Sequence, residues 1–157
     1  MLNPDGVVMG NSRCSFSGQD LNRQFRNPNP RIHPTVSNLK EMISELSRNK
    51  KVLAYFDMHA HSRKKGVFMY GPHYPLHNEK YYKTRVIPKI LSEHTEAFRY
   101  YSCKFRNQKS KRKAARLVIW KEFNLMNSFT IEASFYGWVN NDRTNHSFNT
   151  THLANVG

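Results

Sequence analysis

Apolar residues recur at helical spacing in the segment 35–48. We predict an amphipathic helix there, with Thr35 as its N-cap because a hydroxyl at that position accepts a hydrogen bond from the first turn. A second segment, 78–97, has weaker helical spacing and contains Pro88, which predicts a kink or a helix boundary. The apolar positions that share the face of the first helix are Val36, Leu39, Met42, Ile43 and Leu46.

Short runs of apolar residues predict strands. The run 51–57 is continuous and suits a buried strand, and 67–70 suits a short second strand. The runs 117–120 and 128–135 predict two more strands, and a further one is expected within 100–105.

The remaining segments have the composition of turns and loops. Residues 3–6 read Asn-Pro-Asp-Gly, 10–34 is rich in Gly, Ser, Asn and Pro, and 136–150 is polar. Residues 151–157 have the pattern of the first turn of a helix. Because helices alternate with apolar strands, we predict an α/β fold, and a length of 157 residues suits one domain over 1–157.

The net charge of the chain limits the classes of partner that it is expected to bind. It has 25 Lys and Arg against 11 Asp and Glu, a formal net charge of +14. Such a surface attracts nucleic acid, an anionic membrane or an acidic polypeptide, and charge alone does not choose among them. No apolar window is long enough to predict a membrane span, no signal peptide is recognised, and two cysteines are too few for a disulfide framework.

The first group of residues that could carry chemistry begins at the end of the apolar run 51–57. Asp57 and His59 are two residues apart, so on a strand they share a face. Neutral imidazole is the commonest protein ligand of zinc, and a carboxylate behind it can orient the ring. The alternative is an ordinary hydrogen-bonded surface histidine, which spacing alone favours.

Two further groups have the same ambiguity. Glu132 lies on the polar side of an alternating strand, where it is either a solvent-facing residue or a general base that projects into a cleft. Arg13, Asn22 and Arg23 are either solvated loop residues or a receptor for a terminal carboxylate, because a guanidinium group binds a carboxylate bidentately. Composition alone favours the ordinary interpretation of both groups.

Three segments taken together resemble a known family. They are LNPDGVVMGNSRCSFSGQDLNRQF, FDMHAHSRKKGVFMYG and NSFTIEASFYG, in this order. In combination they are similar to the zinc metallocarboxypeptidases of the carboxypeptidase A type, and most of all to the cytosolic carboxypeptidase (tubulin deglutamylase) branch. The resemblance implies a partial carboxypeptidase-type fold, with a mixed, mostly parallel, twisted sheet flanked by helices. It covers most of the chain and is weakest over 72–115.

The resemblance implies catalytic roles for three residues. His59 matches the third zinc ligand of the family, and Glu132 matches the general base that activates the zinc-bound water. Arg13 matches the arginine that polarises the scissile carbonyl. These roles agree with the chemistry of peptide hydrolysis, because zinc lowers the pKa of its bound water and arginine stabilises negative charge on oxygen.

The resemblance also implies substrate-binding roles. Asn22 and Arg23 match the pair that binds the terminal carboxylate of the substrate. Arg116 matches a basic position associated with a preference for an acidic side chain, although the segment KSKRKAARLVIW lacks the small, glycine-rich run expected before it. His61 matches no functional position and is interpreted as structural. The basic run 63–65 either attracts an acidic tail or forms a solvated turn.

One motif of the family is missing. Its first two zinc ligands come from a His-x-x-Glu motif, and these 157 residues contain none. A catalytic zinc site uses three protein ligands and a water. We therefore expect the C-terminal portion of a catalytic domain, without the N-terminal strands and the end of the last helix, and we expect it to be inactive alone.

Three functional hypotheses remain. The leading one is a zinc carboxypeptidase whose complete parent removes C-terminal residues, glutamates above all, from acidic tails such as polyglutamylated tubulin. The resemblance implies a cytoplasmic location, with cytoskeletal or ciliary association. The alternative is a truncated, non-catalytic module that binds acidic tails or other polyanions. Nonspecific nucleic-acid binding by the basic segment 99–116 is disfavoured, because no recognised nucleic-acid-binding fold supports it.

Overall fold

The computed structural model describes residues 1–11 and 13–156, and the chain divides into two compact units, which are described separately. The single domain predicted over 1–157 stays a prediction. None of the described helices is long and apolar enough to cross a membrane. The described residues of the first unit lie in 1–11, 13–55 and 107–125, and those of the second lie in 56–106 and 126–156.

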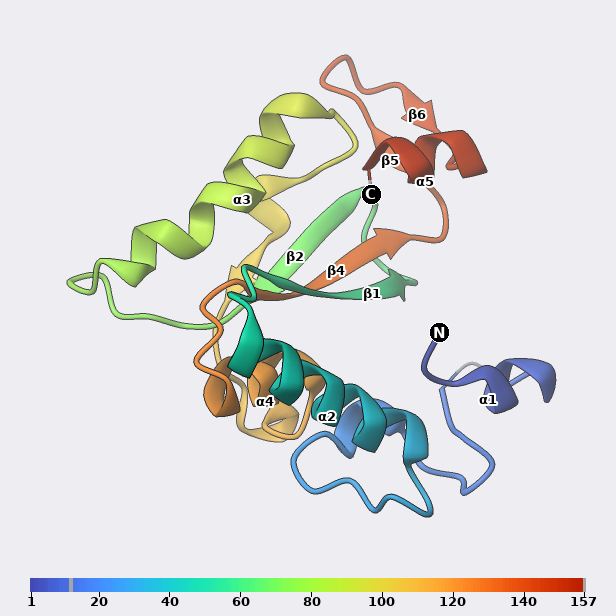
Figure 1. Cartoon of the computed structure of the whole chain (residues 1–157). Coiled ribbons are helices and arrows are strands. Elements are labelled where there is room, and N and C mark those ends of the chain that lie inside the picture. Colours follow the sequence, from blue (N-terminus) through green and yellow to red (C-terminus); the bar gives the residue numbers. More distant parts are fainter. Residues whose placement is uncertain (12, 157) are drawn as a thin grey trace. The chain divides into compact units, whose positions relative to one another are not determined.

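The first unit is helical (Figure 1). Its main hydrophobic cluster joins Val36 of the long helix α2 to Ala115 and Val118 of helix α4, and Leu21 and Phe25 complete it. The elements of this unit are α1 (Pro4–Val8), the 3-10 helix η1 (Leu21–Arg23), α2 (Pro34–Asn49), the 3-10 helix η3 (Lys109–Lys111) and α4 (Ala115–Glu122).

Helix α2 confirms the predicted amphipathic helix but begins earlier. It starts at Pro34, whose fixed φ suits the first helical position, and His33 is its N-cap. The hydroxyl of Thr35 donates instead to the carbonyl oxygen of Leu2, at 2.8 Å. The predicted N-cap is therefore wrong, because Thr35 is already inside the helix.

Helix α4 replaces the strand predicted over 117–120. Residues 114–119 are all buried, Arg116 included, so the uninterrupted apolar run 117–120 contains no polar position that would reveal the helical period. The side-chain oxygen of Asn22 accepts a hydrogen bond from the amide of Ala115 at 2.8 Å. That bond satisfies one of the first amide groups of the helix, which have no partner within the helix itself.

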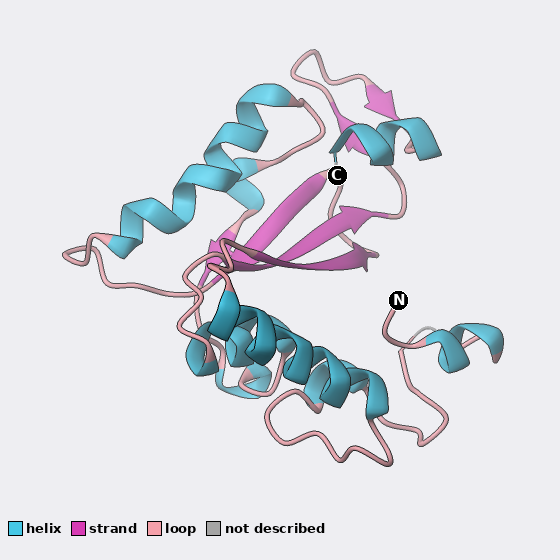
Figure 2. Cartoon of the chain, in the orientation of Figure 1, coloured by secondary structure: helices cyan, strands magenta, loops and turns pink. Residues whose placement is uncertain are grey.

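The second unit is built on a mixed four-stranded sheet (Figures 1 and 2). The strand order is β1-β4-β2-β3, where β2 runs parallel to β3 and antiparallel to β4. The predicted α/β fold class with a mixed sheet is confirmed. The elements are β1 (Tyr55–His61), β2 (Val67–Gly71), α3 (Lys80–His94), the 3-10 helix η2 (Tyr100–Ser102), β3 (Lys104–Phe105), β4 (Ser128–Ser134), β5 (Trp138–Val139), β6 (Asn145–His146) and α5 (Thr150–Val156).

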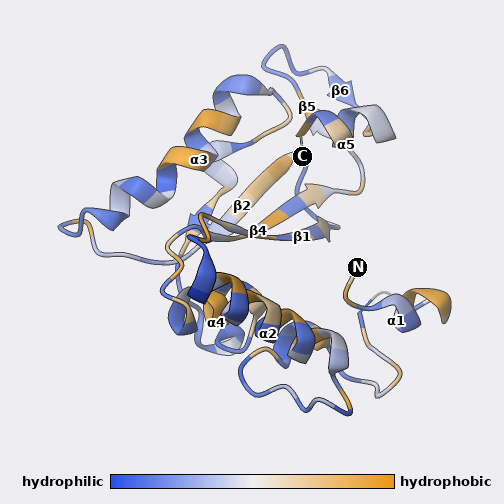
Figure 3. Ribbon diagram, in the orientation of Figure 1, coloured by the Kyte–Doolittle hydropathy of each residue, from blue (hydrophilic) through white to orange (hydrophobic). Residues whose placement is uncertain are grey.

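One face of this sheet forms the core of the second unit. Val67 and Met69 of β2 and Phe129 of β4 are almost fully buried, and Ile87 and Leu91 of α3 pack against their cluster. Figure 3 shows β2 as a largely hydrophobic strand. Side chains alternate along a strand, so the intervening residues of β2 and β4 lie on the opposite face.

Strand β1 lies four residues later than the predicted strand 51–57. It spans Tyr55–His61, and residues 55, 57, 59 and 61 are partly buried whereas 56, 58 and 60 are exposed. The apolar run was misleading because polar side chains, Asp57 and His59 among them, occupy the more buried face of the strand. His59 therefore lies within β1, two residues before the end of the strand.

Candidate functional site

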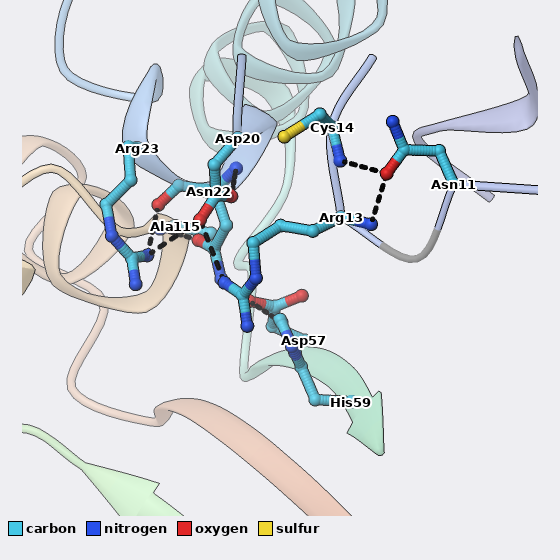
Figure 4. Close-up of polar contacts among 9 residues, drawn as sticks. All are labelled: Asn11, Arg13, Cys14, Asp20, Asn22, Arg23, Asp57, His59 and Ala115. Carbon is cyan, nitrogen blue, oxygen red and sulfur yellow. Dashed lines mark hydrogen bonds and ion pairs between the residues drawn. The ribbon is translucent and has the colours of Figure 1, made fainter. Parts of the chain in front are cut away.

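Strand β1 fixes the orientation of His59. The Nε2 atom of His59 lies 2.9 Å from a carboxylate oxygen of Asp57, and the two side chains are 33% and 14% exposed, respectively (Figure 4). A neutral ring that donates from Nε2 carries its acceptor lone pair on Nδ1. Asp57 therefore selects the tautomer in which Nδ1 is the atom that can ligate a metal ion.

His59 and Glu132 lie on the same face of the sheet. His59 and His61 share a face by alternation, and the His61 ring contacts the ring of Phe68, with 5.2 Å between centroids. Phe68 of β2 pairs directly with Glu132 of β4, and paired residues project to the same side. Because β4 is the neighbour of both β1 and β2, the predicted zinc ligand and the predicted general base lie on adjacent strands.

The turn after β1 is held by His61. Its Nδ1 atom accepts hydrogen bonds from the backbone amides of Arg63, at 3.0 Å, and Lys64, at 3.1 Å. Burial, then the charges of Lys64 and Arg63, lower the pKa of His61, which favours the neutral ring that can accept these bonds. His61 therefore has a structural contact of its own: its ring holds the basic turn that follows β1.

Two residues of the basic run 63–65 make contacts within the second unit. The ammonium of Lys64 lies 4.6 Å from the centroid of the Phe68 ring and 3.5 Å from the carbonyl oxygen of Ser102. Lys65 donates to the side-chain oxygen of Asn145 at 2.6 Å. Two of the three cations are therefore tied to other parts of the second unit.

In the first unit, Asp20 organises the predicted carboxylate receptor (Figure 4). One oxygen of Asp20 accepts a hydrogen bond from the amide of Asn22 at 2.9 Å and caps η1. Its other oxygen lies 2.9 Å from Nη1 of Arg13 and 4.0 Å from Nη1 of Arg23. Sequence reasoning missed Asp20, although an Asp in a loop is a candidate for an Asx turn, in which its side chain accepts a hydrogen bond from the backbone amide two residues later.

The predicted receptor residues differ in their surroundings. Arg13 is two-thirds exposed at its side chain, whereas Arg23 is 26% exposed and donates to the backbone carbonyl of Asn22 at 2.9 Å. Arg116, on helix α4, is only 7% exposed. The structure thus brings Arg13 and Arg23 to one carboxylate of their own unit, and it buries most of Arg116. The substrate-binding roles of these residues stay predictions.

The described residues do not form a complete metal site. In residues 1–11 and 13–156 no group of three or more His, Cys, Asp and Glu side chains is arranged to hold a metal ion. His59, with its ring oriented by Asp57, has the chemistry of one zinc ligand. A catalytic zinc ion needs three protein ligands, so the described part of the chain is insufficient to hold one by itself.

Solved structures with the same fold are carboxypeptidases. The metallo-carboxypeptidase from Burkholderia cenocepacia superposes with a TM-score of 0.79 at 23% sequence identity, over 99% of this chain and 40% of that one. A metallo-carboxypeptidase from Pseudomonas aeruginosa, in complex with (2-guanidinoethylmercapto)succinic acid, gives a TM-score of 0.69 at 22% identity and the same coverage. These neighbours define the class of the fold, which is that of a partial carboxypeptidase, as the sequence predicted.

Curated relatives give the family. Cytosolic carboxypeptidase 1 of Xenopus laevis is 45% identical over 152 residues, which are 87% of this chain and 12% of the relative. Cytosolic carboxypeptidase 3 of Bos taurus is 40% identical over 159 residues, which are 100% of this chain and 16% of the relative. No family model matches the chain. The chain belongs to the cytosolic carboxypeptidase family, and it spans 12% to 16% of the length of these two relatives.

Proposed function

We propose that this chain is part of a zinc metallocarboxypeptidase that removes C-terminal residues, glutamates above all, from acidic protein tails such as that of polyglutamylated tubulin. The observation that carries this proposal is the shared face of His59 and Glu132 on adjacent strands, with Asp57 behind the imidazole. A metal ligand and a carboxylate base must converge on one side of a scaffold if both are to reach one scissile bond.

Each residue has a distinct task in this proposal. The carboxylate of Glu132 accepts a proton from the attacking water and can pass it to the leaving amine. Arg13 stabilises negative charge that develops on the carbonyl oxygen, and Asn22 and Arg23 bind the terminal carboxylate. A bound zinc ion would supply Lewis-acid polarisation, and His59 is the ligand that the described residues contribute.

Charge supports an acidic substrate. A chain with a formal net charge of +14 raises the local concentration of a polyanionic tail. The name cytosolic carboxypeptidase, which the curated relatives carry, supports a cytoplasmic location. Cytoskeletal or ciliary association follows only if tubulin is the substrate, and it is proposed on that condition.

A second candidate function is a non-catalytic module that binds acidic tails. The observation in its favour is the incomplete donor set, because in the described residues His59 lacks the two companions that a catalytic zinc needs. Nucleic-acid binding by 99–116 has less support. Arg116 and the start of α4 are buried, and although other cations of the segment are exposed, no recognised nucleic-acid-binding fold supports this function.

Peptide binding and peptide hydrolysis test the two candidates together. A fluorescent peptide with several C-terminal glutamates should bind the 157-residue chain, and the same peptide with an amidated C-terminus should bind several-fold more weakly. Released glutamate, measured by chromatography with zinc added, should be absent for this chain and present for an intact cytosolic carboxypeptidase. Equal binding of the free and amidated peptides, or displacement by RNA but not by polyglutamate, would contradict the proposal.

A further inference from the structure

Lys64 is a partly buried cation on the face of the sheet that carries Glu132. Its ammonium lies over the ring of Phe68, 4.6 Å from the centroid, and Phe68 is the residue that pairs across the strands with Glu132. Phe68 is itself fully buried. The position of Lys64 is thus set by a rigid aromatic side chain and not only by its own flexible stem.

The backbone also fixes Lys64. The ring of His61 accepts hydrogen bonds from the amides of Arg63 and Lys64, so the turn that carries Lys64 is tied to the end of β1. The carbonyl oxygen of Ser102 lies 3.5 Å from the ammonium on a second side. Two separate segments therefore direct this side chain toward the face that carries Glu132.

Positive charge exceeds negative charge around Lys64. Burial lowers the pKa of Lys64, and the nearby charges of Lys104 and Arg106 lower it further, whereas Cys103 and Glu132 act in the opposite direction. Lys104 belongs to β3, which pairs with β2, the strand that carries Phe68. Three cations thus interact in a region where Glu132 is the carboxylate that counters them, and an additional carboxylate would relieve their mutual repulsion.

We propose that Lys64 is a specificity-determining residue that binds the acidic side chain of a peptide ligand beside Glu132, with Lys104 and Arg106 as supporting charges. This inference rests on the proposed function and moves the preference for acidic residues from Arg116 to the second unit. An ammonium presents three donors to a carboxylate. Because Lys64 is partly desolvated, a charge-assisted hydrogen bond there is stronger than at an exposed lysine.

The test compares two peptides on three proteins. The peptides end in glutamate or in its neutral isostere glutamine, and the proteins are the unmodified chain, Lys64→Met and Lys65→Met. Lys65→Met removes the same charge one residue away and is the matched control. Lys64→Met should weaken binding of the glutamate peptide about tenfold, the size expected for one charge-assisted hydrogen bond, and should leave the glutamine peptide unchanged. Lys65→Met should change both by less than about twofold.

Two further measurements distinguish a binding role from a folding role. Lys64→Arg keeps the charge and should restore most of the preference for glutamate. In the unmodified chain, the glutamate peptide should shift the NMR signals of the Phe68 ring, whereas the glutamine peptide should not. An unchanged ratio of glutamate to glutamine affinities in Lys64→Met, or no Phe68 shift, would overturn the proposal.

These data, combined with the binding of the free and amidated peptides described above, separate this inference from the proposed function. If the chain prefers a free to an amidated C-terminus but Lys64→Met leaves the glutamate preference intact, the assignment of Lys64 fails and the carboxypeptidase proposal survives. If neither peptide binds, both fail.

Discussion

Arg13 and Arg23 of the first unit have different neighbours from Lys64 of the second unit. In the first unit, Arg13 and Arg23 both lie near the carboxylate of Asp20, which also caps η1. In the second unit, Lys64 lies over the ring of Phe68 and near a carbonyl oxygen, and the charge of Glu132 acts on it in the opposite direction to those of Lys104 and Arg106. An aromatic face and a carbonyl compensate a positive charge less completely than a carboxylate does.

This difference has a consequence for ligand binding. A ligand carboxylate that binds Arg13 or Arg23 must compete with Asp20, so Asp20 sets the geometry of the arginines and limits their affinity. A carboxylate that approaches Lys64 meets cations whose repulsion it reduces. The first arrangement suits precise orientation of a terminal carboxylate, and the second suits selection of a negative side chain.

The largest effect on stability should come from substitution of Phe68, whose ring lies under the ammonium of Lys64. Phe68→Ala removes a fully buried ring that contacts His61, Tyr70 and Lys64, so it should lower the free energy of unfolding by about 3–5 kcal/mol. Denaturant unfolding measures this change. Phe135→Ala is the matched control, because Phe135 is 69% exposed and its loss should cost less than about 1 kcal/mol. Equal effects of the two variants would show that Phe68 does not anchor this face.

Asp20→Ala should have the next largest effect. It removes the cap of η1 and the shared partner of Arg13 and Arg23, and we expect a loss of about 1–2 kcal/mol in the free energy of unfolding. Preference for a free over an amidated C-terminus should also fall, since the arginines lose their common orientation. Glu41→Ala, at an exposed position of α2, is the control and should change stability by less than about 0.5 kcal/mol.

The smallest effect is on the reactivity of Cys103. Burial raises the pKa of this thiol to about 11, while the Met69 amide and the charge of Lys64 act in the opposite direction. Only about one molecule in a thousand is therefore thiolate at pH 8, and alkylation should be slow and should accelerate about tenfold per pH unit up to the pKa. Lys64→Met should slow it further, because the positive charge that favours the thiolate is gone.

Mass spectrometry after timed alkylation measures this rate, with Cys14 as an internal control. Lys64→Met should leave the rate of Cys14 unchanged. A faster reaction of Cys103 in Lys64→Met would place Lys64 away from the thiol and contradict the charge cluster in the second unit.

The sequence predicted the polar face of β4 more accurately than the start of β1. Alternation placed Phe129, Ile131 and Ala133 on the side away from Glu132, and the core cluster confirms it. β1 was predicted four residues too early because apolarity was taken as the sign of burial, whereas this strand turns Asp57 and His59 to its more buried face. Where polar residues occupy a functional face, the usual pattern, in which the apolar residues of a strand are the buried ones, is reversed.

Helix α4 depends on a tertiary contact that no local pattern encodes, whereas Asp20 and His61 make their contacts with residues at most seven positions away in the sequence. Helix α4 was predicted as a strand because its apolar run shows no period, and its first amide is capped by Asn22, 93 residues earlier in the sequence. The roles of Asp20 and of the His61 ring appear only once the loops are folded. The resemblance to carboxypeptidases predicted roles for His59 and Glu132, and these roles stay predictions, whereas the contact of Asp57 that orients His59 is seen in the structure.

A crystal structure of the 157-residue chain would test most directly whether His59 and Glu132 share a face. Both side chains should project from the same side of the four-stranded sheet, with the Asp57 carboxylate within hydrogen-bond distance of Nε2 of His59. An electron-density map in which the imidazole and the carboxylate of Glu132 project from opposite sides of that sheet would contradict this prediction.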